Sequence, residues 1–372
     1  MSGTSVDAID SALVRCRHDG VEILATHQHP IPALIKQQIA EISHPGQNEI
    51  ERMGVLDREL GLLFAQATIQ LLATADIRPG QVRAIGSHGQ TIRHRPPSAN
   101  TGGPASFTLQ IGDPNTIAEV TGITTIADFR RRDIAAGGEG APLAPAFHAA
   151  ALAKSGVNRA IVNIGGIANA TILCGSELRM GFDSGPGNTL LDHWVQRHRS
   201  EPYDGDGAWS ASGEAHPALL EQLLGHPYFQ QTGPRSTGKE AFNLRWLDQT
   251  LEAFSDIAAQ DVQATLVELS AVSIARAIKG CALDISEVYV CGGGSHNAHL
   301  MARLSACMTP ATVASTAQLG MDPDWVEAAT FAWLADRTLH GLDGNARAVT
   351  GAAGPRVLGG IYQGATRDSG SA

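Results

Sequence analysis

The alternation of apolar and polar residues divides the chain into strands and helices that follow one another regularly. Period-2 or continuous apolar runs predict strands at 11–14, 21–25, 82–86, 107–112, 124–127, 159–164, 167–173, 287–291 and 359–362. Apolar residues three and four apart predict helices at 33–42, 48–75, 116–121, 145–153, 189–195, 217–224, 243–253 and 261–279. Strands that alternate with helices of this length indicate an α/β protein.

Glycine-rich turns lie at Gly3, at Gly165–Gly166 and at Gly292–Gly294. The first two belong to hairpin-like units, and the third follows a strand and precedes a helix. Glycine lets the backbone approach a flat or phosphorylated ligand closely, and a turn with hydroxyl groups can cradle an anion. The alternative is that these glycines only allow tight packing. The first two turns have the same hairpin layout about one domain apart, which indicates a weak internal repeat of two similar halves. No strand leads into the Gly3 turn, so we expect a late start or a lost strand.

A run from Gly181 to Asn188 reads as a strand end, a tight turn and the start of a helix. Asp183 would then lie at the carboxyl end of a strand, where open α/β sheets bind ligands, and could act as a general base. Asn188 is the predicted N-cap of the helix. The alternative for Asp183 is a residue that closes a turn, because aspartate is common in turns.

Three further groups of residues have both a functional and a structural interpretation. His88 follows a strand in the turn Ser87–Thr91 and is either a substrate contact or a satisfied turn residue. The arginines 130–132 are either a clamp for carboxylate or phosphate or a solvated charged turn. Glu327 begins a helix and belongs either to the surface or to a site.

Composition restricts the class of protein further. A net charge of −10 argues against general nucleic-acid binding. Five scattered cysteines without a C-x-x-C pair predict reduced thiols and no zinc site. No apolar stretch reaches the ~18 residues of a membrane span. We therefore expect a cytoplasmic protein without a membrane partner. The small-residue stretch near 137–140 predicts a hinge between domains at 1–135 and 136–362. The C-terminal tail can pack on the first domain, and residues 363–372 are expected to form a flexible tail.

Five motifs in this order resemble the anhydro-N-acetylmuramic acid kinase family of the actin-like sugar kinase superfamily. They are residues 1–10, 86–91, 127–133, 181–188 and 290–294. The resemblance implies a two-domain actin-like, ribonuclease H-like fold with a cleft between the domains. Family members carry a short strand before the first motif, and here it is absent.

The resemblance also implies an activity. The family opens the 1,6-anhydro ring of anhydro-N-acetylmuramic acid with water and phosphorylates the sugar at its 6-hydroxyl with ATP and Mg²⁺, in cell-wall recycling and amino-sugar catabolism. Asp183 would be the base and Glu327 would position the water or the sugar. Alternatives are another actin-like sugar kinase or a non-catalytic nucleotide-binding module of the same fold.

By motif match, the resemblance assigns the remaining binding residues. The expected substrate contacts are Arg130, Arg131, His88, Gln90 and Thr91. The expected ATP contacts are Gly3, Thr4, Ser5, Val6, Asp7, Ala8, Ile9, Asp10, Asn163, Gly165, Gly166, Gly292, Gly293 and Gly294. Asp7 is the expected Mg²⁺ ligand. The expected partner is the small amino sugar, and a homodimer is the default assembly.

Overall fold

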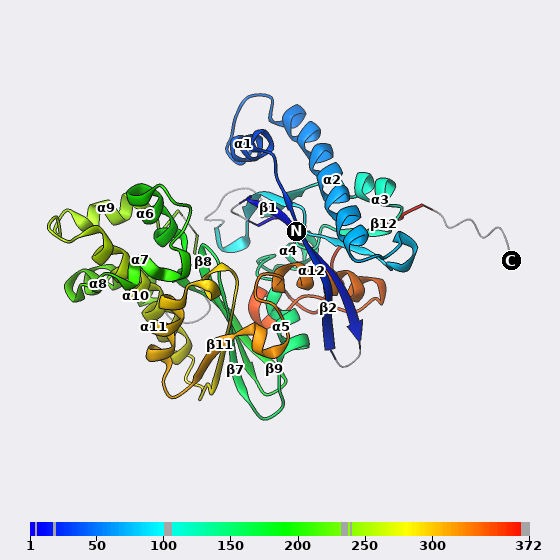
Figure 1. Cartoon of the computed structure of the whole chain (residues 1–372). Coiled ribbons are helices and arrows are strands. Elements are labelled where there is room, and N and C mark those ends of the chain that lie inside the picture. Colours follow the sequence, from blue (N-terminus) through cyan, green and yellow to red (C-terminus); the bar gives the residue numbers. More distant parts are fainter. Residues whose placement is uncertain (4–5, 18–19, 100–105, 232–236, 239, 366–372) are drawn as a thin grey trace. The chain divides into compact units, whose positions relative to one another are not determined.

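The computed structural model describes residues 1–3, 6–17, 20–99, 106–231, 237–238 and 240–365 (Figure 1). The chain forms two compact units. Unit 1 comprises Met1–Ala151 and Glu327–Ala372, and unit 2 comprises Leu152–Val326. These bounds differ from the predicted division after residue 135, because segments on both sides of unit 2 in the sequence belong to unit 1.

The described part of unit 1 contains three separate sheets together with the helices around them. The first is the antiparallel hairpin of β1 (Ala8–Arg17) and β2 (Gly20–Pro30), and the second has the order β12-β6-β3. The strands of the second sheet are β3 (Ile85–Ser87), β6 (Thr125–Ala127) and β12 (Gly360–Tyr362). A smaller ribbon pairs β4 (Gln90–Arg95) with β5 (Phe107–Ile111). The helices are α1 (Ala33–Ile42), α2 (Glu49–Thr74), α3 (Pro114–Thr121), α4 (Arg131–Ala135), α5 (Ala144–Leu152), α12 (Val326–Leu339) and α13 (Arg347–Thr350).

Unit 2 contains one five-stranded sheet of order β11-β10-β7-β8-β9. Its strands are β7 (Asn158–Ile164), β8 (Ile167–Cys174), β9 (Glu177–Pro186), β10 (Glu287–Cys291) and β11 (Thr312–Ser315). β7 runs antiparallel to β8 and parallel to β10. The helices are α6 (Thr189–Arg199), α7 (Ala208–Ala211), α8 (Pro217–Leu224), α9 (Leu244–Leu251), α10 (Ala259–Lys279) and α11 (Ala298–Met308).

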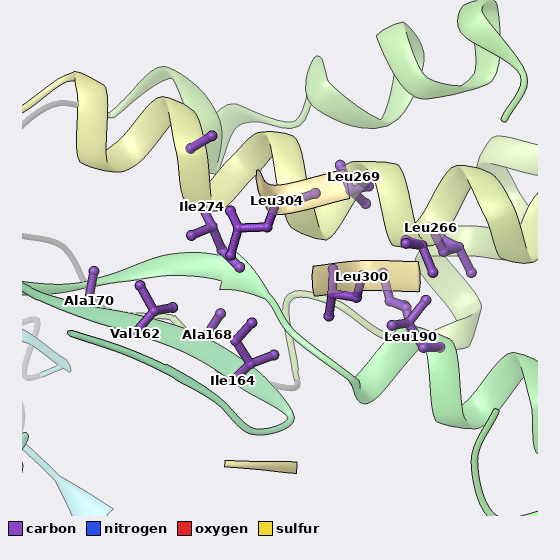
Figure 2. Packing of buried hydrophobic residues seen from close by; sticks show 14 of the residues in the cluster. Val162, Ile164, Ala168, Ala170, Leu190, Leu266, Leu269, Ile274, Leu300 and Leu304 are labelled. Atoms are coloured by element: carbon purple, nitrogen blue, oxygen red, sulfur yellow. The ribbon is translucent and has the colours of Figure 1, made fainter. Parts of the chain in front are cut away.

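The core of unit 2 explains why β7 and β8 are almost continuously apolar. Figure 2 shows Val162, Ile164, Ala168 and Ala170 of these strands packed near side chains of α6, α10 and α11. The labelled helical residues are Leu190, Leu266, Leu269, Ile274, Leu300 and Leu304. Since a central strand buries both of its faces, it cannot carry the alternating polar residues of a half-exposed strand. This packing fixes the turn that joins β7 to β8.

The two units share one order of elements, as the internal repeat predicted. In both units two antiparallel strands come first, a long helix follows, and two parallel strands with a helix between them come last. In unit 1 these elements are β1, β2, α2, β3, α3 and β6. In unit 2 they are β8, β9, α10, β10, α11 and β11. The α/β class is thus confirmed, and the repeat agrees with the predicted actin-like fold.

Most predicted elements are present with small shifts at their ends. α1 and α8 have the predicted bounds. The strand predicted at 82–86 is shorter and begins at Ile85, because a 3₁₀ turn at Pro79–Gln81 precedes it and its pairing with β6 starts at Ile85. Among the described residues, no helix is both long enough and apolar enough to cross a membrane.

Candidate functional site

His88 and Arg130 form a direct pair in unit 1. His88 lies just after β3 and is 6% exposed. Its Nδ1 is 2.9 Å from the carbonyl oxygen of Gly89, and the Nε of Arg130 is 3.0 Å from its Nε2. Because a carbonyl can only accept, Nδ1 carries the proton and Nε2 accepts from the guanidinium. Burial, the charge of Arg130 and the Met1 ammonium hold the pKa of His88 well below its usual value, so the ring is neutral.

A buried network fixes Arg130 from the other side. Its Nη1 donates to the carbonyl oxygen of Gly140 at 2.9 Å. The backbone N–H of Gly140 donates to Asp133, a fully buried carboxylate that also accepts from Asn345 and Thr350. The predicted small-residue hinge is therefore bonded at Gly140 to Asp133, and side chains more than 200 residues away in sequence hold Asp133 in place.

Glu327 at the start of α12 lies in the electrostatic field of this pair. Its side chain is accessible to solvent, yet the surrounding protein desolvates the carboxyl group and raises its pKa above the usual value of 4.5. The charges of Arg130 and the Met1 ammonium oppose this rise, whereas Asp10 adds to it. A carboxyl group with a raised pKa beside a fixed arginine is suited to proton transfer or to holding a polar ligand.

The N-terminal turn is hydrogen-bonded to Gln90, two residues after His88. The Ser2 hydroxyl donates to Oε1 of Gln90 at 2.6 Å, and both side chains are buried. Val6 adopts a positive φ of 57°, which closes the turn before β1. The side chain of Ile9 lies in the hydrophobic core of unit 1, so only its backbone can face a ligand. The predicted contacts Thr4 and Ser5 lie outside the described residues.

The remaining residues predicted in unit 1 are more exposed. Arg131 points to solvent and its Nε lies 3.3 Å from Asp128 Oδ1. Thr91 accepts from Gln110 Nε2 at 3.2 Å. Asp7 is 77% exposed and faces Lys36 at 3.7 Å. Of the arginines 130–132, only Arg130 is linked to His88 by a hydrogen bond that the structure shows.

Asp183 is the candidate base of unit 2, and two backbone contacts fix it. It lies in β9 opposite Asn169 of β8 and is half-buried. Its Oδ2 accepts from the backbone N–H of Thr237 at 2.9 Å, and the hydroxyl of Tyr228 donates to its carbonyl oxygen at 2.6 Å. Asp183 was predicted to close a strand, but β9 continues to Pro186. The carboxylate therefore belongs to a rigid antiparallel strand.

The predicted glycine turns of unit 2 pack against each other. The backbone N–H of Gly187 donates to Gly166, and that of Asn188 donates to Gly165. A Cβ at Gly292 would lie 2.3 Å from Asn163 Oδ1, and one at Gly294 would lie 2.3 Å from Ile164 Cγ2. Only glycine allows this approach, so Gly292 and Gly294 pack against Asn163 and Ile164 at the end of β7.

Asn188 occupies the predicted N-cap position of α6, but it does not cap the helix with its side chain. Asn188 precedes α6, but its backbone is helical and its side chain makes no capping hydrogen bond. Its Nδ2 donates instead to the carbonyl oxygen of Ile164 at 3.2 Å, at the end of β7. The side chain of Asn188 therefore bonds to the neighbouring strand instead of capping its own helix. This bond links the turn before α6 to the turn after β7.

The described residues contain no group of three His, Cys, Asp or Glu side chains that could hold a metal ion. Mg²⁺ in nucleotide sites is commonly held by one or two carboxylates, water and the phosphates themselves. Asp7, the predicted Mg²⁺ ligand, is an exposed carboxylate of this kind.

Sequence analysis missed the residues that hold the candidate groups in place. Tyr228 and Thr237 lie 45 and 54 positions after Asp183, and Asp133 connects to Asn345. Asp133 is itself the last residue of the charged motif 127–133, and its place in that motif was a weak signal. For Tyr228, we find no signal in the sequence.

Comparisons with known proteins agree with the motifs. A family model described as anhydro-N-acetylmuramic acid kinase matches residues 1–364. The protein of that name from Shewanella sp. (strain ANA-3) is 51% identical over 97% of both chains, and that from Coxiella burnetii (strain Dugway 5J108-111) is 50% identical over 98% of this chain and 96% of its own. The solved structure of component A of the (R)-2-hydroxyglutaryl-CoA dehydratase from Acidaminococcus fermentans matches 86% of this chain and 95% of its own, but a TM-score of 0.42 at 9% identity supports no argument. The chain belongs to the anhydro-N-acetylmuramic acid kinase family.

Proposed function

We propose that this protein is an ATP-dependent kinase that opens the 1,6-anhydro ring of anhydro-N-acetylmuramic acid with water and phosphorylates the product at its 6-oxygen. The match to the family over residues 1–364 carries this proposal. The linked glycine turns of unit 2 and the His88–Arg130 pair of unit 1 support it, because they offer backbone groups for phosphates and a cation for an acidic sugar.

The proposed reaction needs one base, since the departing oxygen can take the phosphoryl group directly. Asp183 removes a proton from the water that attacks the anomeric carbon. The 6-oxygen leaves that carbon and receives the γ-phosphoryl group, which takes the place of the acid of an ordinary glycosidase. ATP supplies the phosphoryl group, whose bond to the β-phosphate oxygen breaks, and ADP leaves. Asp7 would help to hold Mg²⁺, which would supply positive charge against the phosphates.

The other residues bind and orient the sugar in this proposal. Arg130 meets the carboxylate of the lactyl group, and the neutral His88 and Gln90 hold hydroxyl or amide groups of the sugar. Glu327 orients the attacking water. Arg131 and Thr91 form the outer edge of the sugar site. The glycine turns Gly165–Gly166 and Gly292–Gly294, together with Asn163 and residues 3–10, bind the nucleotide.

A product assay in ¹⁸O-labelled water tests the proposal. The protein is incubated with ATP, Mg²⁺ and anhydro-N-acetylmuramic acid, and the sugar is analysed by mass spectrometry. We expect a phosphorylated sugar with one ¹⁸O atom, because hydrolysis and transfer occur together. Phosphorylation without the label indicates another sugar kinase reaction, and ATP binding without any product indicates a nucleotide-binding module. Native mass measurement in the same buffer tests the expected homodimer.

A further inference from the structure

Asp128 has a backbone conformation that glycine adopts more readily than aspartate. It follows β6 directly and has a φ of 63°, in the left-handed region. The next two residues explain the turn. Phe129 is 2% exposed, with its ring 5.6 Å from that of Phe331, and Arg130 donates to His88. The chain must therefore turn sharply at residue 128 to place both side chains, and glycine would allow this turn with the least strain.

The carboxylate of Asp128 gains little from its surroundings. Within the described part of the chain it is paired with Arg131 alone, at 3.3 Å, and the two side chains are 32% and 57% exposed. Ion pairs as exposed as this one contribute little to stability. Desolvation raises the pKa of Asp128 above its usual value, although the charge of Arg131 opposes the rise. Aspartates in such turns often bond to their own backbone, and this carboxylate makes no such bond to the described residues.

The position of Asp128 relates it to the proposed sugar contacts of unit 1. β3 and β6 are parallel, and Ser87 pairs with Ala127. The residues that follow, His88 and Asp128, therefore leave the carboxyl ends of adjacent strands at the same edge of the sheet. Open α/β sheets bind their ligands at this edge. A strained residue with a poorly compensated charge at such an edge indicates a role in ligand binding.

We propose that Asp128 binds the free hydroxyl group of the sugar, an inference that rests on the proposed function. In anhydro-N-acetylmuramic acid, O1 and O6 close the anhydro ring, O3 carries the lactyl ether and C2 carries the acetamido group. The 4-hydroxyl is therefore the one free hydroxyl. It donates to Oδ2 of Asp128, because a carboxylate can only accept and Oδ1 faces Arg131. A hydrogen bond to an ionised acceptor is stronger than one to a neutral group.

Kinetics with the 4-deoxy analogue of the sugar test this contact on the full chain. We expect the original chain to use the analogue with a kcat/KM about ten- to a hundredfold below that of the sugar, because a hydrogen bond to a charged group is lost. Asp128→Gly should lower kcat/KM for the sugar by a similar factor and use both sugars equally well. Asp128→Asn should fall between, since its amide oxygen accepts without a charge.

Two kinetic results would overturn the proposal. One is an Asp128→Gly variant that still discriminates against the 4-deoxy sugar as the original chain does. The other is a variant that instead stops discriminating against an analogue with an ester in place of the acetamido group, because Asp128 would then bind the acetamido N–H. If the original chain phosphorylates neither sugar, the proposed function is wrong and this inference falls with it.

A stability measurement separates binding from a purely structural role. Asp76 is the matched control, because it is an exposed aspartate just after α2 with a φ of 54° and is not a proposed contact. We expect Asp76→Gly and Asp128→Gly both to raise the urea midpoint, since glycine adopts this conformation without strain, and only Asp128→Gly to lose activity. A lower midpoint for Asp128→Gly beside a higher one for Asp76→Gly would make Asp128 a structural residue and overturn the proposal.

Discussion

At the scale of single residues, Asp183 carries the sharpest prediction of the proposed reaction. Its carboxylate is held by Thr237 and its backbone by Tyr228, so an amide in the same place keeps the shape and loses the base. We expect Asp183→Asn to abolish ring opening and phosphorylation together, by a factor of about 10² or more, because general-base catalysis contributes at least that much. Product analysis in labelled water measures both steps, and phosphorylated sugar at a near-normal rate would exclude Asp183 as the base.

Tyr228 should act on the reaction only through the position of Asp183. Tyr228→Phe keeps the ring among its aromatic neighbours and removes one hydroxyl. A hydrogen bond contributes on the order of 1 kcal/mol, so we expect kcat to fall by up to about tenfold while KM for the sugar changes little. The matched control is Tyr203→Phe, since Tyr203 is 63% exposed. A change in KM without a change in kcat would contradict a positioning role.

The raised pKa of Glu327 predicts the pH dependence of the proposed activity. Desolvation disfavours the ionised form, so the group takes up a proton at a higher pH than an ordinary glutamate. If the carboxylate orients the water, activity is lost as the pH falls through this raised pKa, and the acid limb of kcat/KM lies above pH 4.5. Glu327→Gln should lower the activity and remove that limb. An unchanged limb in this variant, as expected for the exposed control Glu119→Gln, would assign it to another group.

At the scale of elements, hydrophobic period predicted most helices and strands because their burial follows that period. α2 and α10, for example, were both predicted from apolar residues at helical spacing. The contacts of Asn188 and Tyr228 were not predicted, because they depend on how distant strands and loops meet and leave no local pattern. The glycine turns were predictable as turns. The reason for Gly187 is that a Cβ there would lie 2.3 Å from the Gly165 carbonyl oxygen, which only the folded sheet shows.

Two glycines with opposite surroundings test this argument. A Cβ at Gly187 would overlap the Gly165 oxygen, so Gly187→Ala must move the turn that joins β9 to α6. Gly54 lies in α2 and has nothing within 4 Å of the position of a Cβ. We expect Gly54→Ala to raise the free energy of unfolding by about 0.5–1 kcal/mol and Gly187→Ala to lower it by about 1–3 kcal/mol. Urea denaturation measures both, and equal effects would contradict the role of close packing.

At the scale of the whole molecule, the repeated order of elements places the candidate groups in both units. His88, Arg130 and Glu327 belong to unit 1, whereas Asp183 and the linked glycine turns belong to unit 2. The sequence predicted that His88 and Arg130 lie in the first half and Asp183 in the second, but it placed Glu327 in the second domain. The predicted division put residues 327–362 in the second domain, because their place in unit 1 depends on contacts such as those of Asp133 with Asn345 and Thr350.

Stability of the whole chain should fall in mild acid because several histidines are held neutral. Burial lowers the pKa of His148 from 6.5 to about 3, and burial together with Arg130 and Arg95 lowers that of His94 to about 4. In the unfolded chain both rings protonate near pH 6.5. Between that pH and the lower pKa of each ring in the folded chain, the unfolded state therefore binds more protons than the folded state. The free energy of unfolding therefore decreases as the pH falls below 6.5, by about 1.4 kcal/mol per pH unit for each such group.

His148→Leu separates this effect from general acid sensitivity. The variant removes one titrating ring that is 1% exposed and puts an apolar side chain in its place in α5. Urea midpoints at pH 7.5 and pH 5 should differ less in the variant than in the original chain, since one proton no longer binds on unfolding. The exposed His44→Leu is the control, and its pH dependence should match that of the original chain. If His148→Leu also leaves the pH dependence unchanged, the ring of His148 is already protonated in the folded state and is not held neutral by burial.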